Sequence, residues 1–106
     1  MKMVSKYRNK KTEANGIMFD SKKEASYYLY LKSLLDAGVI KDLHLQVPFV
    51  LIEKSQYGRV IKYVADFVYE QDGQMIVVDV KGVKTDVYKL KKRLMAEKYG
   101  IKIREV

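Results

Sequence analysis

The sequence predicts an α/β domain with the element order αβββαβ, in which a mixed sheet is flanked by two helices. Residues 21–37 and 85–99 repeat apolar side chains at the spacing of one helix face. Three runs rich in β-branched and aromatic residues lie between these segments, and a last short run, IKIREV, follows the second one. Strands and helices that follow each other in this way build a single layered α/β core.

The first predicted helix begins at a capping signal in FDSKKEASYYLYL. Ser21 can accept the hydrogen bond of an N-cap, and Glu24 follows at the capping-box spacing. Gly38 ends the segment, because glycine favours the left-handed conformation that closes helices. The expected inner face consists of Ala25, Tyr28, Leu29, Leu31, Leu35 and the stem of Lys32.

The three middle strands are predicted from LHLQVPFVLIE, RVIKYVADFVYE and QMIVVDVK. Pro48 cannot donate a backbone hydrogen bond, so the first strand is expected at a sheet edge or with a bulge. Asp72-Gly73 separates the other two strands, and this dipeptide is the strongest short hairpin signal. The second and third strands are therefore expected to pair in antiparallel fashion.

The second helix is predicted to begin at the N-cap Thr85 and to end at Gly100. A helical wheel places its apolar residues on one arc: Val87, Tyr88, Leu90, Leu94, Met95 and Tyr99. Basic residues dominate the other arc: Lys89, Lys92 and Arg93, with Glu97. Lys91 falls inside the apolar arc, and we expect it near the end of VVDVK, where it can reach a phosphate.

Charge is the strongest compositional signal. The chain has 21 Lys and Arg against 13 Asp and Glu, a formal net charge of +8. This balance indicates a polyanionic partner, most often nucleic acid. A basic protein without such a partner is the alternative.

Residues 1–16 are predicted to form a basic arm that ends at the turn Asn15-Gly16, and residues 17–106 a single domain. The absence of cysteine excludes disulfides, thiolate zinc sites and cysteine nucleophiles. No apolar run reaches the roughly 18 residues of a membrane span, and the first residues do not follow the pattern of a secretory signal. A cytoplasmic location and no membrane partner are therefore expected.

The predicted hairpin brings two carboxylates together. A two-residue turn at Asp72-Gly73 pairs Phe67 with Val78, and one step further it pairs Asp66 with Asp79. Directly opposed side chains have Cβ atoms about 4.5–5.5 Å apart on one face, so the two charges would repel. A bulge would shift this register.

Lys81 lies on the same face as Asp79, because side chains alternate along a strand. Two hard oxygen donors at this separation suit Mg²⁺ or Mn²⁺. With a lysine beside the metal, the group can polarise a phosphate and activate a water molecule. The alternative is that each residue alone is an ordinary turn or surface residue, and that Glu24 serves only in the capping box.

The order Glu24, Asp66, Asp79-Val80-Lys81 resembles the PD-(D/E)XK nuclease superfamily, although the second-strand motif lacks proline and the third-strand motif has aspartate for glutamate. The segments FDSKKEASYYLYL, YVADFVYE, VVDVKG and TDVYKLKKRL are similar to a family of small phage and prophage proteins known as a domain of unknown function. This resemblance covers the chain from about Tyr7. It implies a restriction-endonuclease-like core and a metal-dependent phosphodiesterase related to Holliday-junction resolvases.

Carried over by position, the resemblance implies that Asp66, Asp79 and Glu24 bind the metal and that Lys81 activates the water. Gln46 is added as support for the site, with an ordinary edge-strand residue as its alternative. The residues expected to contact DNA are Lys6, Arg8, Lys10, Lys11, Lys84, Lys89, Lys92 and Arg93.

The sequence thus predicts a Mg²⁺-dependent endonuclease, acting as a homodimer on branched DNA such as Holliday junctions. The alternatives are a nicking or restriction-type nuclease on duplex DNA, a DNA-binding module without catalysis, and a basic accessory protein that binds a phage partner.

Overall fold

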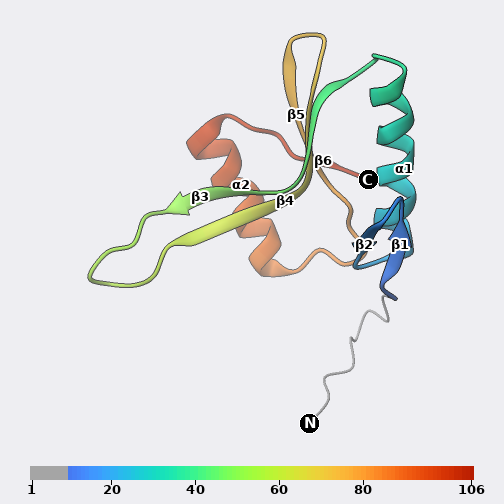
Figure 1. Ribbon diagram of the computed structural model, residues 1–106. Helices are drawn as coiled ribbons and strands as arrows, with labels where there is room; N and C mark the ends of the chain where they lie inside the picture. The colour runs from blue at the N-terminus through green and yellow to red at the C-terminus, as the bar shows by residue number, and fades with distance from the viewer. Residues whose placement is uncertain (1–9) are drawn as a thin grey trace.

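The computed structural model describes residues 10–106, and Figure 1 shows how their strands and helices are arranged. The elements are β1 Thr12–Ala14, β2 Ile17–Phe19, α1 Lys22–Asp36, β3 Lys41–Ile52, β4 Ile61–Gln71, β5 Gln74–Asp79, α2 Asp86–Tyr99 and β6 Arg104–Glu105. From α1 onward they follow the predicted order αβββαβ. The α/β class, with a mixed sheet and two helices, is confirmed.

The main sheet has the strand order β3-β4-β5-β6. Its first three strands are antiparallel, whereas β6 runs parallel to β5, which makes the sheet mixed. The strand that contains Pro48 lies at the edge, as predicted. The β4–β5 hairpin has the predicted register, with Phe67 opposite Val78 and Val68 opposite Val77.

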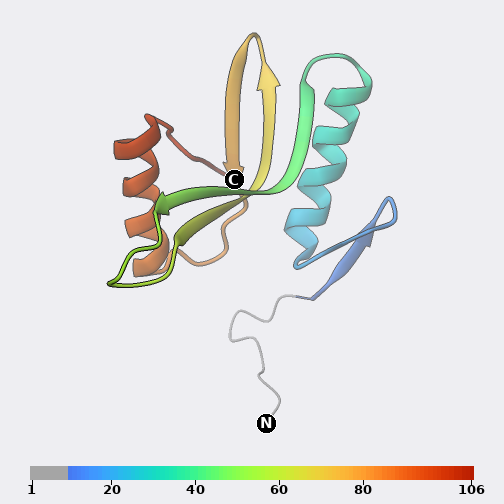
Figure 2. The ribbon, with the colours of Figure 1, turned by 60° about the vertical axis from the view of Figure 1, so that its left-hand side comes forward.

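The two helices pack on opposite faces of the sheet (Figure 2). Phe67 of β4 belongs to the cluster of buried side chains under α1, but Ala65, two residues earlier, belongs to the cluster under α2. Regular alternation would put both on one face. The change of face occurs at Asp66, opposite Gln46, which has a left-handed φ of 53°. Asp66 therefore lies where the strand turns from one layer to the other.

Both helices are capped as predicted. Ser21 Oγ accepts from the backbone N–H of Glu24 at 3.1 Å, and Thr85 Oγ1 accepts from that of Tyr88 at 3.1 Å. Gly100 closes α2 with a left-handed φ of 66°. These bonds fix the starts of α1 and α2, the two helix ends nearest the sheet residues Asp66 and Asp79.

The inner faces of the helices are narrower than the helical wheel predicted. Leu29 of α1 and Val87 and Leu90 of α2 are more than half exposed, so their placement in the core was wrong. The small sheet buries only a strip of each helix, centred on Tyr28 and Leu31 in α1. In α2 the corresponding residues are Tyr88 and Met95.

The N-terminal boundary of the domain also differs from the prediction. Residues 12–14 were placed in the basic arm, but they form β1 and pair with β2. Asn15-Gly16 is the turn between these strands, and Ala14 and Phe19 are buried under α1. The hairpin is stable because burial of these two side chains offsets the cost of ordering it. Residues 1–9 lie outside the described part of the chain.

Candidate active site

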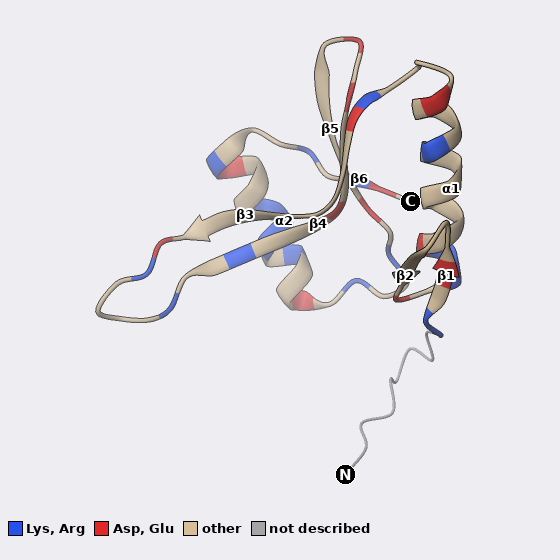
Figure 3. Ribbon diagram, in the orientation of Figure 1, with Lys and Arg blue, Asp and Glu red and all other residues tan. Residues whose placement is uncertain are grey.

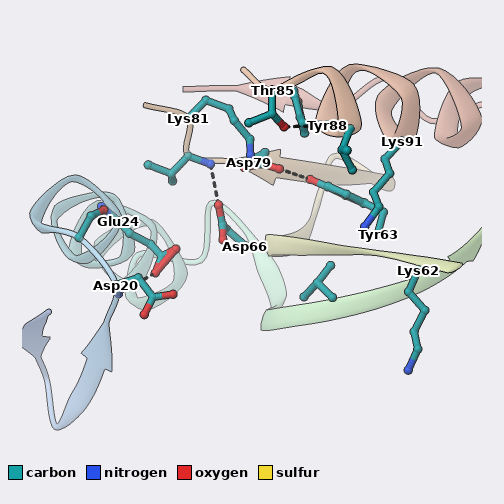
Figure 4. A pocket seen from close by; sticks show the side chains of 14 residues that line it. Asp20, Glu24, Lys62, Tyr63, Asp66, Asp79, Lys81, Thr85, Tyr88 and Lys91 are labelled. Carbon is teal, nitrogen blue, oxygen red and sulfur yellow. Dashed lines mark hydrogen bonds and ion pairs between the residues drawn. The ribbon is translucent and has the colours of Figure 1, made fainter. Parts of the chain in front are cut away.

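An open pocket of about 420 Å³ lies between the N-terminus of α1, strands β4 and β5 and the first turns of α2 (Figure 4). Glu24, Asp66, Asp79 and Lys81, the four residues predicted as catalytic, all line it. Lys91, predicted as a supporting residue, lines it as well. The fold therefore brings together in space side chains that are far apart in the sequence.

Asp79, the last residue of β5, is the most deeply buried of the carboxylates, with 3% of its surface exposed. Tyr63 of β4 donates its hydroxyl to Oδ2 of Asp79 at 2.5 Å, and Nζ of Lys81 lies 3.3 Å from Oδ1. A carboxylate has about four lone-pair sites. Both oxygens of Asp79 therefore keep capacity for a further ligand.

Asp66 is half-buried and is held by two donors. Its Oδ2 accepts from the backbone N–H of Val80 at 2.8 Å, and Nε2 of Gln46 donates to Oδ1 at 3.4 Å. The pairing of β4 with β5 ends at Phe67 and Val78, one position before Asp66 and Asp79, but the two carboxyls lie close enough for each to affect the pKa of the other. Gln46 therefore lies at the edge of the site, against one of its carboxylates.

Glu24 is buried at the start of α1, with 7% of its surface exposed. Its Oε1 accepts from the backbone N–H of Asp20 at 3.4 Å, one residue before the capping-box position. Its carboxyl also lies close enough to Asp66 to raise the pKa of that residue. The capping role and a place in the pocket are therefore compatible.

Lys81 is fixed by two contacts. In addition to its ion pair with Asp79, its Nζ lies 4.0 Å from the centroid of the Tyr88 ring, where the electron-rich face attracts a cation. The Tyr88 hydroxyl donates to Oε2 of Glu105 at 2.7 Å, which anchors the ring. The ammonium group is thus held at the pocket wall, and the side chain is 23% exposed.

The pocket contains more carboxylate than ammonium. Burial raises the pKa of Asp79 to about 6, and the Asp66 carboxyl adds to this rise, while Tyr63 and Lys81 oppose it. Burial also raises the pKa of Asp66, and Glu24 acts in the same direction. These carboxyls resist ionising together, so a bound cation would stabilise the ionised pocket.

The donor set fits Mg²⁺ or Mn²⁺. Within residues 10–106, no three His, Cys, Asp or Glu side chains converge closely enough to hold a metal ion by themselves. Mg²⁺ does not require this, because it keeps several waters and binds through one or two carboxylates and the substrate phosphate. Asp66 and Asp79 would supply these carboxylates, with Glu24 close to Asp66.

The predicted DNA-binding residues fall into three groups. Lys6 and Arg8 lie outside the described residues. Lys84 and Lys92 both pair with Glu105, at 3.1 and 3.2 Å, and Arg93 lies 3.8 Å from Glu97. Lys10, Lys11 and Lys89 are exposed. Lys84 and Lys92 therefore also help to hold Glu105 in place behind Tyr88.

Sequence reasoning missed several residues that line the pocket, among them Asp20, Lys62, Tyr63 and Tyr88. Tyr63 stands three positions from Asp66, so regular alternation would place these two on opposite faces. Tyr63 nevertheless donates to Asp79, and Asp66 accepts from the backbone of the next residue, Val80. Both side chains reach the pocket because β4 changes face at Asp66. Tyr88 was predicted as a core residue, and it also supports Lys81. The sequence signal for this second role is its place in the first turn of the helix that follows Lys81.

The pocket and the mixed sheet define an α/β protein with a carboxylate and lysine site. The chain belongs to the family described as protein of unknown function (DUF1064), whose model matches residues 4–105. No curated protein and no solved structure matches it. Among the described residues, no helix is long and apolar enough to cross a membrane.

Proposed function

We propose that this protein is a metal-dependent endonuclease of the PD-(D/E)XK type, which hydrolyses phosphodiester bonds in branched or otherwise structured DNA such as Holliday junctions. The observation that carries the proposal is the meeting of Asp66, Asp79 and Lys81 in one open pocket, with Glu24 beside them. The αβββαβ order and the restriction-endonuclease-like arrangement of these residues support it. A role in phage replication or recombination, in the cytoplasm of the host, follows from the resemblance.

Asp66 and Asp79 would hold Mg²⁺ or Mn²⁺, with Glu24 as a ligand directly or through water. A bound ion of this kind polarises the phosphate and lowers the pKa of its water. Lys81 would stabilise negative charge on the attacking water or on the pentavalent phosphate. Tyr63 would keep the Asp79 carboxylate in one orientation through its 2.5 Å hydrogen bond.

Basic side chains near the pocket would contact the phosphates on either side of the cleaved bond. Lys62 and Lys91 line the pocket itself. Lys89 is exposed on α2, close in sequence to both Lys91 and the pocket residue Tyr88. Such contacts give affinity without reading the bases, so binding should weaken steeply with salt.

A homodimer would allow two strands to be cut, because one pocket cuts one strand. Two residues of the segment YYLYL in α1 support this arrangement. Tyr28 is buried in the core, but Leu29 and Tyr30 are each more than half exposed on α1. An exposed apolar pair of this kind suits a two-fold contact.

The first prediction tests the proposal on the wild-type protein. Incubated with a four-way junction, plain duplex and single strands, it should cut DNA with Mg²⁺ and not with EDTA, and should cut the junction fastest. Gel analysis of end-labelled strands measures this. Equal cutting of duplex favours the nicking or restriction-type nuclease. Salt-sensitive binding without cutting favours the DNA-binding module and contradicts the proposed enzyme.

The second prediction concerns Tyr88. Tyr88→Leu should lower kcat about 2- to 30-fold, because the cation–π contact that holds Lys81 contributes about 0.5–2 kcal/mol. Tyr88→Phe keeps the ring and should retain more of the activity, although its link to Glu105 is lost. Since the ring positions Lys81 and does not bind substrate, KM should change little. A fall in kcat/KM that comes only from KM would contradict this role.

A further inference from the structure

The segment between β3 and β4 forms an arm that projects beyond the ends of the two strands (Figure 1). Residues 52–62 are all exposed. The last pair of β3 and β4, Ile52 with Ile61, closes the base of the arm, and an isolated bridge between Ser55 and Gly58 closes its tip. An exposed ordered projection of this length buries little of its own surface, which suggests that it contacts something else.

Tyr57 stands at the tip of the arm, with 90% of its surface exposed. The tip is a tight turn in which Ser55 and Gly58 bond to each other through their backbones, at 3.0 and 3.3 Å. The backbone N–H of Tyr57 donates to the Oγ of Ser55 at 3.1 Å. The turn therefore holds the aromatic ring in solvent. Little conformational entropy is then lost when a planar group stacks on the ring.

The charge of the arm favours a nucleic acid as that partner. Lys54, Arg59 and Lys62 lie along it against Glu53 alone (Figure 3). An aromatic ring between basic side chains is the combination that binds single-stranded nucleic acid, where bases stack on rings and cations neutralise phosphates. A protein partner that docks on an apolar surface would not need this charge.

The arm leads directly to the candidate active site. Lys62, at the base of the arm, lines the pocket together with Tyr63 and Val64. Tyr57 is five residues before Lys62, so at most roughly 17 Å of extended chain separates them. This upper limit corresponds to about five steps of a stacked nucleic-acid strand at about 3.4 Å each.

We propose that Tyr57 is a stacking platform for an unpaired nucleobase a few nucleotides from the cleaved phosphate, and that Arg59 and Lys62 hold the phosphates between them. The inference rests on the proposed function and adds a reason for its substrate class. Branch points, flaps and tails offer unpaired bases to such a ring, whereas a continuous duplex keeps its bases stacked inside.

The test is a binding measurement in EDTA, which separates it from cleavage. The probes are a duplex, the same duplex with a single-stranded thymine tail, and a tail of equal length that lacks its bases. Wild-type protein should prefer the thymine tail to the abasic tail, and Tyr57→Ala should lose about 5- to 100-fold in affinity for the thymine tail alone. Tyr57→Trp should retain the preference.

Met75→Ala, which removes another large exposed side chain on β5, away from the arm and the pocket lining, is the matched control and should bind like the wild type. An unchanged Kd for Tyr57→Ala, or an equal loss for all three probes, would overturn the stacking role. Protein that binds none of the probes would contradict the proposed nuclease itself. Binding without a Tyr57 effect would contradict only the stacking platform.

Discussion

Replacing Asp79 with asparagine should abolish cleavage and also make the metal-free protein more stable. The variant loses a negative ligand for the metal, and we expect kcat/KM to fall on the order of 10³-fold. Its amide oxygen can still accept from Tyr63, and its NH₂ group can donate to Asp66. The repulsion between the buried Asp79 carboxyl and the half-buried Asp66 carboxyl is removed, and the melting temperature in EDTA should rise by roughly 5 °C or more.

The raised pKa of Asp79 also determines how the stability of the metal-free protein changes with pH. The pKa of Asp79 is about 6 in the folded protein, against about 3.9 in an unfolded chain. The folded state therefore binds the proton more tightly, and this contribution to stability is complete below about pH 4 and is lost as the pH rises through about 6. In EDTA the wild type should lose on the order of 3 kcal/mol of unfolding free energy over this range.

Urea unfolding at several pH values measures this loss. Asp79→Asn should show a smaller decline, because only Asp66, whose pKa is also raised, then contributes in the same direction. Asp36→Asn removes an exposed carboxylate that pairs with Lys32 on α1, and it serves as the control with an unchanged decline in stability. A lower melting temperature for Asp79→Asn in EDTA would rule out the opposed-carboxylate geometry.

The positions of Asp66 and Asp79 were predictable because a two-residue turn allows only one register between the two strands that it joins. Asp72-Gly73 requires left-handed backbone, which both residues adopt, and every pair from Gln71 to Phe67 then follows. The N-cap of each helix was also predictable, because its hydrogen bond joins two residues only three positions apart in the sequence. Local chemistry thus determined where most of the site lies.

The change of face at Asp66 was not predictable, because it depends on a neighbouring strand. Gln46, twenty residues earlier in the sequence, adopts the left-handed conformation opposite Asp66. No local signal in LHLQVPF marks it, as glutamine has no preference for that conformation. The contact between Tyr63 and Asp79 and the exposure of Leu90 follow from tertiary packing in the same way.

Some basic residues also acquired roles that a helical wheel cannot show. Lys84 and Lys92 lie eight positions apart in sequence and meet at Glu105, a residue of the last strand. Tyr88 donates to the same carboxylate, and this hydrogen bond, with the two lysines, lowers the pKa of Glu105 to about 2. Glu105 therefore stays ionised and anchors the ring on which Lys81 rests.

Replacing Lys81 with alanine should lower cleavage by about 10²- to 10³-fold, which is the loss typical of removing one group that stabilises transition-state charge. Lys81→Arg keeps the charge, but its planar fork does not match the position of Nζ between Asp79 and the Tyr88 ring, so activity should recover only in part. Lys41→Ala removes an exposed lysine that pairs with Glu70 at the far end of β4, and it should cut like the wild type.

The metal response should distinguish Lys81→Ala from Asp79→Asn, although both variants should cleave far more slowly than the wild type. Asp79 would be a ligand, so its variant should lose the rise in melting temperature that we expect Mg²⁺ to give the wild type. Lys81 would not be a ligand, because its ammonium group has no lone pair, so its variant should keep that rise. In EDTA it should melt below the wild type, because Asp79 then lacks its nearest cation. An Lys81→Ala variant that cuts normally, or one that no longer responds to Mg²⁺, would contradict the assigned roles.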